Sequence, residues 1–419
     1  MKLAIIGGSA ASTPALFRCD AMRDAAESLD VVLTGRSRER LDAVARAIGI
    51  VTDGAFASLR TVEHGTAAAR SAMRGCDVVL VQVRCGGYLG RAFDETFPLR
   101  FSIPGDEGLG PGGLSAAWRS WQSLRDMLTI VQEECPTAFV VLMTSPVSLL
   151  VRCILAEFPD IRVAGICELP WTTLKSACEP FGKDASAAHF TYAGVNHLGW
   201  FASIDCGELD VVGAYAAQRD RDFPSRSLVE SSGVPLKYLR LHYEREAVVR
   251  EQLALAVPRG AELEMLQRRA IELFAFGDRD EVDAAIASRP TPWYADAIAP
   301  LIASFALGSD GPIPFFLSAR SRGALDGFAD DDILELPHEL VEGRLVPIEG
   351  SCGVTPQARR VLEDFVRYER LAADAVLSRD PSAIVAALRA HPWVDDDAAA
   401  RGLADAIVYQ ETAAAASVM

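Results

Sequence analysis

The feature that most constrains the fold is a series of five short apolar segments in the first 165 residues. They read KLAIIGG, DVVLTG, DVVLVQV, AFVVLMTSP and IRVAGIC, and stretches with helical spacing separate them. Strands that are apolar on both faces need a layer of helices on each side, which is typical of a parallel sheet. The sequence therefore predicts an α/β fold.

The pattern changes after residue 165. HFTYAGVNHLGWFASIDCG alternates as antiparallel strands do, while PLKYLRLHYEREAVVREQLALA and AELEMLQRRAIELFAFG place apolar residues at helical spacing. At 419 residues the chain exceeds the size at which one core keeps growing. We expect a Rossmann-type parallel-sheet domain over residues 1–165 and an α+β domain over residues 166–419.

Composition and charge exclude several classes of function. The formal net charge is −16, which argues against a nucleic-acid partner or a membrane surface. No segment approaches the roughly 18 apolar residues of a membrane-spanning helix, and MKLAIIGG lacks the features of a secretion signal. Nine cysteines without a CxxC pair are typical of reduced thiols. We expect a cytoplasmic protein in which a few local arginines meet any anionic substrate.

A glycine pair follows the first predicted strand in IIGGSAASTPALF. Gly7 and Gly8 allow close backbone approach to a pyrophosphate, and a helix beginning near Thr13 and Pro14 would direct its free amides at the anion. A plain strand-to-helix turn also needs glycine, and the pair is not a regular GxGxxG. The second strand ends in VVLTGRSRER without a carboxylate for the ribose. Arg36 and Arg38 lie there, and an arginine at this place either binds a 2′-phosphate, favouring NADP, or is a solvated residue at a helix start.

Further stretches occur in a fixed order along nearly the whole chain. They are the glycine turn, VQVRCGGYLGRAFDETFPLRFSIPGDEGLGPGGL, the TSP of residues 144–146, GICELP, GVNHLGW, PLKYLRLHY, ILELP and AHPWV. Together they resemble family 4 of the glycoside hydrolases, the NAD-dependent group that includes 6-phospho-glucosidases, α-galactosidases and α-glucuronidases. The VQVRCGG to GPGGL block looks most like the 6-phospho-β-glucosidase branch.

The resemblance implies hydrolysis through redox steps. In that family NAD⁺ takes a hydride from C3 of the sugar, the C2 proton is removed, the aglycone leaves by C1–C2 elimination, water adds, and the hydride returns to C3. We expect a glycosidase for a phosphorylated or otherwise anionic hexoside, working as a homodimer or homotetramer. The alternatives are an NAD(P)-dependent sugar 3-dehydrogenase, a glycosidase for a sulfonated or uronic sugar, and an inactive binding protein.

The resemblance also implies a metal and two catalytic side chains. Cys167 and His197 correspond to the ligands of a divalent metal, usually Mn²⁺, which stabilises the developing enolate as a Lewis acid. From the residues alone, a small core cysteine and a hydrogen-bonded interior histidine are the alternative. Tyr238 corresponds to the base that removes the C2 proton, or else is a core aromatic. Glu107 corresponds to a site glutamate that acts as acid or base.

The remaining site residues also follow from the resemblance. The expected cofactor-binding residues are Gly7, Gly8, Ser9, Thr13, Pro14, Arg36, Val83 and Thr144. The expected substrate-binding residues are Arg84, Ser145, Glu168, Asn196 and Arg289. Arg84 ends a predicted parallel strand, where ligands gather in such sheets. An ion pair with Asp94 or Glu95 is the alternative for Arg84.

The departures from the family pattern lie on the substrate side. Ser145 and Glu168 replace asparagines, and Arg289 is followed by Pro-Thr-Pro where the family has two glycines. Arg320 and Arg322 appear where an asparagine pair is expected. The three arginines are either rebuilt contacts to a substrate anion or surface charges.

Overall fold

The computed structural model describes residues 1–56, 58–308 and 314–416, with side chains up to residue 410. Within these ranges the strands form one sheet of 13 strands. The first group of strands is β1 (Lys2–Ile6), β2 (Asp30–Gly35), β3 (Leu59–Glu63), β4 (Val78–Val81), β5 (Phe139–Leu142) and β6 (Arg162–Ile166). The second group is β7 (His189–Val195), β8 (Leu198–Cys206), β9 (Leu209–Asp210), β10 (Val234–Pro235), β11 (Phe315–Arg320), β12 (Ile333–Val341) and β13 (Arg344–Pro347).

The two groups of strands pair differently. The order is β10-β8-β7-β12-β11-β6-β5-β4-β1-β2-β3, with β13 beside β12 and β9 beside β8. Pairs from β6 to β3 are parallel, whereas β11 joins β6 antiparallel, with Leu317 opposite Ile166. The predicted α/β fold, with a Rossmann-type sheet followed by an α+β part, is confirmed. The division at residues 165 and 166 falls within β6 and stays a prediction.

Helices cover both faces of this sheet. The earlier ones are α1 (Thr13–Arg18), α2 (Asp20–Asp24), α3 (Arg38–Val51), α4 (Ala67–Met73), α5 (Gly87–Thr96), α6 (Gly110–Glu134), α7 (Val147–Glu157), α8 (Leu169–Cys178) and α9 (Val211–Ala217). The later ones are α10 (Arg226–Ser232), α11 (Arg240–Tyr243), α12 (Arg245–Leu253), α13 (Arg259–Phe276), α14 (Arg279–Ala287), α15 (Ala299–Leu307), α16 (Pro356–Ser378), α17 (Pro381–Ala390) and α18 (Asp397–Ala416). No described helix is both long and apolar enough to span a bilayer.

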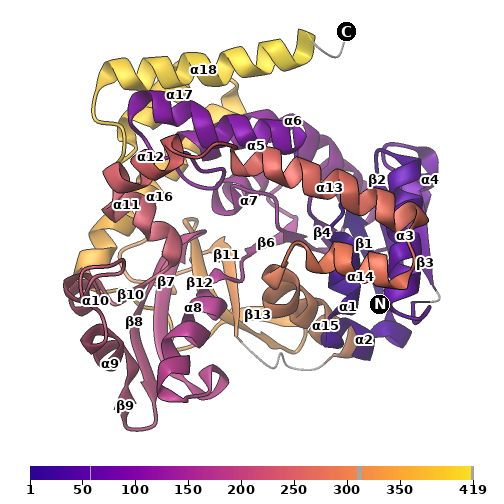
Figure 1. Cartoon of the computed structure of the whole chain (residues 1–419), viewed down its shortest axis with the longest axis horizontal. Coiled ribbons are helices and arrows are strands. Elements are labelled where there is room, and N and C mark those ends of the chain that lie inside the picture. Colours follow the sequence, from indigo (N-terminus) through magenta and orange to yellow (C-terminus); the bar gives the residue numbers. More distant parts are fainter. Residues whose placement is uncertain (57, 309–313, 417–419) are drawn as a thin grey trace.

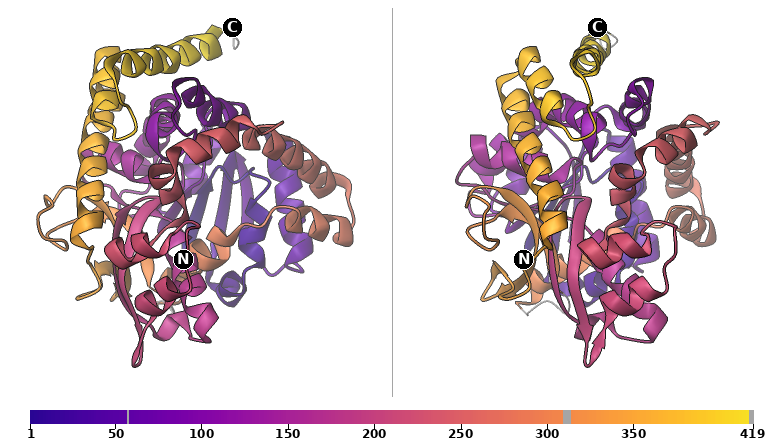
Figure 2. Two further views of the ribbon diagram at one scale, coloured as in Figure 1. Left: turned by 60° about the vertical axis from the view of Figure 1, so that its left-hand side comes forward. Right: turned by 90° about the vertical axis from the view of Figure 1, so that its left-hand side faces the viewer.

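Alternation along β1 shows how the two faces are filled. Leu3 and Ile5 pack in one core with α1, α3 and α15, whereas Ala4 and Ile6 pack in another with α6, α7 and α16. Because successive side chains of a strand point to opposite faces, a strand that is apolar throughout is buried on both. The C-terminal α17 and α18 pack together at one end of the molecule, at the top of both views in Figure 2.

Helix α13 packs against two helices, each of which follows a strand of the parallel half. It contacts α5, which follows β4, and α3, which follows β2 (Figure 1). The Arg46 guanidinium on α3 donates to the carbonyls of Phe274 (2.8 Å) and Gly277 (2.7 Å) at the end of α13. Near the start of α13, a Cβ on Gly260 would lie 2.7 Å from the amide nitrogen of Ala92 on α5. Close packing at both ends therefore holds α13 over this edge of the sheet.

Candidate active site

The predicted site residues gather just beyond the carboxyl ends of the parallel strands. Gly7 follows β1, Arg36 follows β2, Arg84 lies beyond β4, Thr144 beyond β5, and Cys167 directly follows β6. Ligands of open α/β sheets bind outside this edge. Parallel pairing thus brings together residues that are far apart in the sequence.

The glycine turn packs against the neighbouring strands. The amides of Gly7 and Gly8 both donate to the carbonyl of Thr34 on β2, at 3.0 and 2.8 Å. Gly7 has φ +88°, and a Cβ there would lie 2.8 Å from the carbonyl oxygen of Gln82. A Cβ on Gly8 would lie 2.9 Å from that of Leu33. Both positions therefore require glycine for this close approach.

Gln82, which follows β4, holds the glycine turn from below and was not predicted from the sequence. Its Nε2 donates to Thr13 Oγ1 (2.9 Å) and to the Gly7 carbonyl (3.3 Å), and its Oε1 accepts from the hydroxyl of Tyr294 (2.8 Å). Thr13 and Pro14 are buried, so they support the turn rather than line the crevice. The available signal was a polar residue directly after the apolar run VVLV.

Cys167 and His197 approach one region from separate elements. His197 occupies the short turn between β7 and β8, where Val195 pairs with Leu198. Its φ of +69° is uncommon for a residue other than glycine. The Cys167 side chain is buried, and the charge of Glu168 acts on both Cys167 and His197.

The electrostatics of the pair suit a cation. Burial raises the pKa of the Cys167 thiol well above its usual value, and Glu168 and Glu335 raise it further. Burial lowers the pKa of His197, although Glu168 and Glu107 oppose this shift, so the imidazole is neutral near pH 7. A divalent cation would reverse the shift of the thiol and bind the neutral imidazole.

Unsatisfied polar atoms also mark this end of the crevice. His197 Nδ1 and Asn196 Oδ1 are buried without a hydrogen-bond partner among the described residues. Buried polar atoms are normally paired, so their exceptions point to a missing ligand. The described ranges contain no group of three or more His, Cys, Asp or Glu side chains arranged to hold a metal. The unpaired imidazole nitrogen of His197 and the buried thiol of Cys167 are two donors that would fit a divalent metal whose other positions are open to substrate and water oxygens.

Tyr238 lies beside the proposed metal ligands. Its ring stacks on the His197 imidazole with 4.5 Å between centroids and 7° between planes. Burial raises the pKa of Tyr238 well above its usual value; Asp106 and Glu107 add to this shift, and Arg91 opposes it. A phenol in this setting needs a neighbouring cation before it can act as a base.

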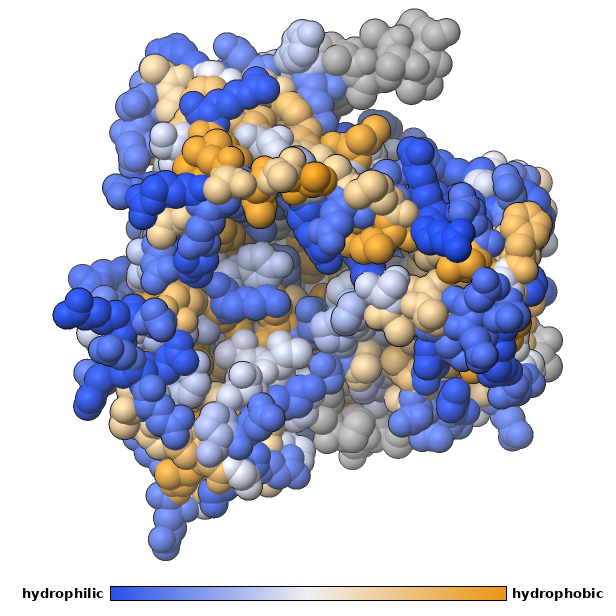
Figure 3. All heavy atoms as spheres, viewed as in Figure 1, coloured by the Kyte–Doolittle hydropathy of each residue, from blue (hydrophilic) through white to orange (hydrophobic). Residues whose placement is uncertain are grey.

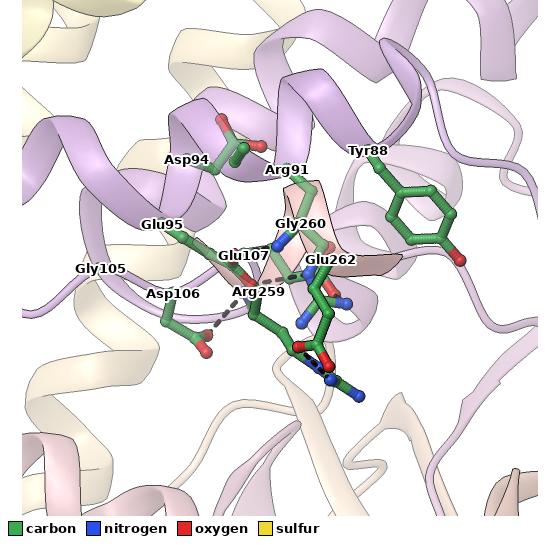
Figure 4. Close-up of polar contacts among 12 residues, drawn as sticks. Tyr88, Arg91, Asp94, Glu95, Gly105, Asp106, Glu107, Arg259, Gly260 and Glu262 are labelled. Carbon is green, nitrogen blue, oxygen red and sulfur yellow. Dashed lines mark hydrogen bonds and ion pairs between the residues drawn. The ribbon is translucent and has the colours of Figure 1, made fainter. Parts of the chain in front are cut away.

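Glu107 is paired with two arginines. It contacts Arg84 and lies 2.8 Å from Arg91 Nη1, which reaches it from α5 (Figure 4). Burial favours a higher pKa for Glu107, but the two guanidinium groups outweigh it and the net pKa is lowered. Glu107 is therefore ionised near neutral pH, a state in which a carboxylate accepts hydrogen bonds. Arg84 pairs with Glu107 and not with Asp94 or Glu95, which bind other arginines.

The predicted substrate residues fall into two groups. Glu168 Oε2 lies 3.7 Å from Cys167 Sγ, and Asn196 Nδ2 donates to Glu335 Oε2 at 3.4 Å. Glu168 and Asn196 therefore belong to the part of the crevice around Cys167 and His197, which we call the metal end. Ser145 lies beyond β5 at the same edge of the sheet. Arg289 is instead packed against aromatic rings, as described next.

Arg289 lies near the glycine turn. Its guanidinium donates to the Tyr88 hydroxyl and lies 5.5 Å from the Trp293 ring centroid. With Ser12 and Gln267 it lines a small crevice between α1, α13 and α14. Within the described residues no hydrogen bond or ion pair joins Arg289 to the metal end. Figure 3 shows the same face hollowed near its centre, below α13.

Arg320 and Arg322 lie toward the amino ends of the parallel strands, on the side of the sheet opposite the site residues. Because Leu317 pairs with Ile166 at the carboxyl end of β6, Arg320 falls three residues closer to the amino end of that strand. Its side chain donates to the carbonyl of Leu155 at 3.3 Å. The register therefore favours the second alternative for these arginines, surface charges rather than contacts to a substrate anion, since antiparallel pairing carries Arg320 away from the carboxyl ends of the parallel strands.

Comparison with known proteins agrees with this geometry. The model for "Family 4 glycosyl hydrolase" matches residues 2–179, and the model for "Family 4 glycosyl hydrolase C-terminal domain" matches residues 192–394. A "Probable 6-phospho-beta-glucosidase" of Bacillus subtilis is 23% identical over 427 residues, covering 97% of this chain and 95% of that protein.

Solved structures show the same fold. The 6-phospho-beta glucosidase from Thermotoga maritima, solved with NAD and glucose-6-phosphate, superposes with a TM-score of 0.87 at 22% identity and covers 98% of each chain. A lactate dehydrogenase from Cryptosporidium parvum has a TM-score of 0.51 at 15% identity, covering 90% of this chain and 97% of that one. The resemblance predicted from the sequence is confirmed by two family models that match in order over most of the molecule. The chain belongs to family 4 of the glycosyl hydrolases.

Proposed function

We propose that the protein is a glycosidase, dependent on a nicotinamide dinucleotide and a divalent metal, that hydrolyses a 6-phospho-β-glucoside or a closely similar anionic hexoside. The observation that carries this proposal is the approach of Cys167, His197 and Tyr238 to one another at the sheet edge that also holds the glycine turn. The Thermotoga maritima relative has been solved with manganese, NAD⁺ and glucose-6-phosphate, which supports the same ligands here.

The glycine turn and its neighbours would hold the dinucleotide. When bound, the nicotinamide supplies a hydride acceptor that returns the hydride within the same turnover. Ser9 and the start of α1 would face the pyrophosphate, and Gly7 and Gly8, whose amides donate to the Thr34 carbonyl, would allow its close approach to the turn. Val83 and Thr144, beyond β4 and β5, lie on the side of the metal pair and are joined by a 3.1 Å hydrogen bond from Thr144 Oγ1 to the Val83 carbonyl.

Cys167 and His197 would hold the metal. A bound Mn²⁺ supplies a Lewis acid for the oxygen that gains negative charge. The carboxylate of Glu168 makes the surroundings negative, which favours a divalent cation over a second anion, whereas burial raises the pKa of Glu335 to about 8 and leaves it mostly neutral near pH 7. Glu168 and Asn196 are placed to accept and donate hydrogen bonds with sugar hydroxyls beside that cation.

Proton transfer is assigned to Tyr238. The stacked His197 ring fixes the orientation of the phenol, and a cation held by Cys167 and His197 would oppose the burial that raises the pKa of Tyr238. Glu107, ionised between Arg84 and Arg91, serves as a second proton acceptor or orients a hydroxyl. Arg84 remains partly exposed beside this carboxylate and is placed to contact the anionic group of the sugar.

We also expect a cytoplasmic homodimer or homotetramer. Apolar side chains that are strongly exposed in the single chain include Leu253, Leu255, Met265 and Phe276, all on or next to α12 and α13. Such side chains are commonly covered by a partner. Gel filtration with light scattering measures the assembly, and a monomer at micromolar concentration would contradict it.

The test is a screen of chromogenic β-glycosides that carry a 6-phosphate, a sulfonate or a uronic carboxylate, with dinucleotide and Mn²⁺ under reducing conditions. We expect aglycone release that requires both additions and is accompanied by deuterium uptake at C2 from heavy water. Net accumulation of reduced dinucleotide without aglycone would assign a sugar dehydrogenase instead. Absence of both reactions with every glycoside would contradict the proposal.

A further inference from the structure

Two arginines beyond β2 stand out because they have no partner. Arg36 is exposed and Arg40 is partly buried on the first turn of α3. Neither guanidinium makes a hydrogen bond or ion pair with another described residue, and Arg40 Nε is buried. Arg38, between them, is paired with Asp42 (3.5 Å) and donates to Thr61 Oγ1 (2.9 Å). In a chain with net charge −16, two adjacent unpaired arginines mark a local site for an anion.

The packing of the glycine turn excludes a carboxylate from the end of β2. A Cβ on Gly35 would lie 2.6 Å from Ser9 Oγ and 2.8 Å from Ser9 Cβ. Gly35 therefore makes room for Ser9, and an acidic side chain at position 35 would displace it. An acidic residue near the end of this strand is what normally binds the 2′-hydroxyl of an NAD ribose. This chain has glycine at the strand end and arginines beyond it.

The two arginines lie close to each other. Arg36 and Arg40 are close enough for their charges to interact, and Tyr88 on α5 and Glu264 on α13 also act on Arg40. Burial and the positive charge of Arg36 lower the pKa of Arg40, while Glu264 and Tyr88 oppose this shift. Arg40, on the first turn of α3, thus lies near both α5 and α13. An anion bound there would relieve the repulsion between the two guanidinium groups.

The position of this pair identifies the anion. In the sheet, β2 is four strands from β6, which is about 19 Å at roughly 4.8 Å per strand. That separation is too large for a phosphate on the sugar bound beside Cys167. It corresponds instead to the adenosine end of a dinucleotide that extends from the metal end past the glycine turn.

We propose that Arg36 and Arg40 bind the 2′-phosphate of the cofactor, so that this glycosidase uses NADP in preference to NAD. The inference rests on the proposed function, because it assumes a dinucleotide at the glycine turn. It differs from the NAD seen with the Thermotoga maritima relative. Charge-assisted hydrogen bonds from two guanidinium groups to a dianionic phosphate supply the preference.

The test is calorimetric titration of the unmodified protein with NADP⁺, NAD⁺, adenosine 2′,5′-bisphosphate and 5′-AMP. We expect NADP⁺ to bind at least about 10-fold more tightly than NAD⁺, and the bisphosphate more tightly than 5′-AMP. The difference in affinity between NADP⁺ and NAD⁺ should decrease as the salt concentration rises, since exposed charges are screened. Equal or tighter binding of NAD⁺ would overturn the proposal.

Variants separate the two arginines from general surface charge. Arg36→Ala and Arg40→Ala should each weaken NADP⁺ binding by about 10-fold or more and leave NAD⁺ binding nearly unchanged. Arg36→Glu, at an exposed position that tolerates the change, should reverse the preference toward NAD⁺. Arg38→Ala is the matched control and should change neither affinity. An equal loss in Arg38→Ala and Arg36→Ala would contradict a specific site.

Activity distinguishes failure of this inference from failure of the proposed function. Aglycone release supported by NAD⁺, with no stronger binding of NADP⁺, would retain the glycosidase and reject the arginine site. Failure of both dinucleotides to bind would reject both proposals.

Discussion

The two ends of the crevice are opposite in charge. At the β2 end, Arg36 and Arg40 have no acidic partner, whereas at the β6 end Cys167 and His197 lie among carboxylates, Glu168 foremost. An anionic cofactor and a divalent cation can therefore occupy one crevice of an acidic protein. The difference teaches that local charge, rather than the net charge of −16, decides what each end binds.

The glycine turn and the metal end also differ in how completely their polar groups are hydrogen-bonded. At the glycine turn, Gln82 bonds to Thr13, Gly7 and Tyr294, so the turn is rigid before any ligand arrives. At the metal end, His197 Nδ1 is buried without a partner among the described residues. A preorganised turn suits a cofactor that is retained through the reaction, whereas open donors suit a metal and a substrate that complete the site.

The largest effect is expected from the metal end. Tyr238→Phe removes the proposed base while keeping the ring on His197, so aglycone release should fall by about 10²-fold to 10⁴-fold. Deuterium exchange at C2 should slow by the same factor, with a much smaller change in sugar affinity. Tyr243→Phe, a nearby tyrosine outside the stack, is the control. An unchanged exchange rate in Tyr238→Phe would assign the base to another residue.

Loss of a ligand should separate metal binding from cofactor binding. Cys167→Ser replaces a thiolate by a weaker donor, and we expect Mn²⁺ affinity to fall by at least about 100-fold, more than the loss of an outer-shell contact. Dinucleotide affinity should stay within about twofold, because Cys167 lies beyond β6, four strands from β2. A Mn²⁺ titration monitored by electron paramagnetic resonance measures the metal affinity, and calorimetry measures the dinucleotide affinity.

Cys352→Ser is the control for the metal prediction, since Cys352 is also a free thiol, although it is only partly buried whereas Cys167 is buried. It should retain both affinities. Equal Mn²⁺ binding by Cys167→Ser and the unmodified protein would remove Cys167 from the metal site.

The cofactor end should respond to its supporting residues. Gln82→Leu removes the hydrogen bonds that Gln82 makes with Thr13, Gly7 and Tyr294, so dinucleotide affinity should fall by about 10-fold. Tyr294→Phe removes only one of these hydrogen bonds and should have a smaller effect. Mn²⁺ affinity serves as the internal reference and should not change. A loss of Mn²⁺ binding equal to that of dinucleotide would show that the two ends are not independent.

A smaller effect, on stability, is expected from a region outside the crevice. Burial lowers the pKa of His391 to about 3 and that of His242 to about 4; each ring shares a hydrogen bond with Trp393. The unfolded chain binds protons at these histidines below its pKa of about 6.5, and the folded chain does not. The contribution of these two histidines to the free energy of unfolding should therefore be constant above pH 6.5 and should fall between pH 6.5 and about pH 4.

The expected slope is about 1.4 kcal/mol per pH unit for each histidine in that interval. Denaturant unfolding at several pH values measures it. His391→Gln should flatten the profile, whereas His189→Gln, at an exposed position, should not. A profile of the unmodified protein that rises as pH falls below 6.5 would contradict this assignment.

Much of this molecule could be predicted from its sequence. The apolar runs of β1, β2, β4, β5 and β6 have no polar alternation, so only a parallel sheet covered on both faces can bury them. The turn glycines Gly7 and Gly8 follow from the same local rule, because φ and close approach are properties of single residues. Cys167 and His197 were predicted as metal ligands because the order of the motifs resembles a known family, and that order can be read from a single sequence.

Only the tertiary structure decided which charges meet. Arg84 pairs with Glu107 rather than with its sequence neighbours Asp94 and Glu95, and Arg320 points away from the crevice because β11 runs antiparallel to β6. The isolation of Arg40 near α13 depends on a helix more than two hundred residues further along the chain. Strand and turn propensities act over a few residues, whereas the energy of a charge depends on every group that packing brings near it. That is why the sequence by itself determined the sheet, the turn and the family, and why the fold determined the charge at each end of the crevice.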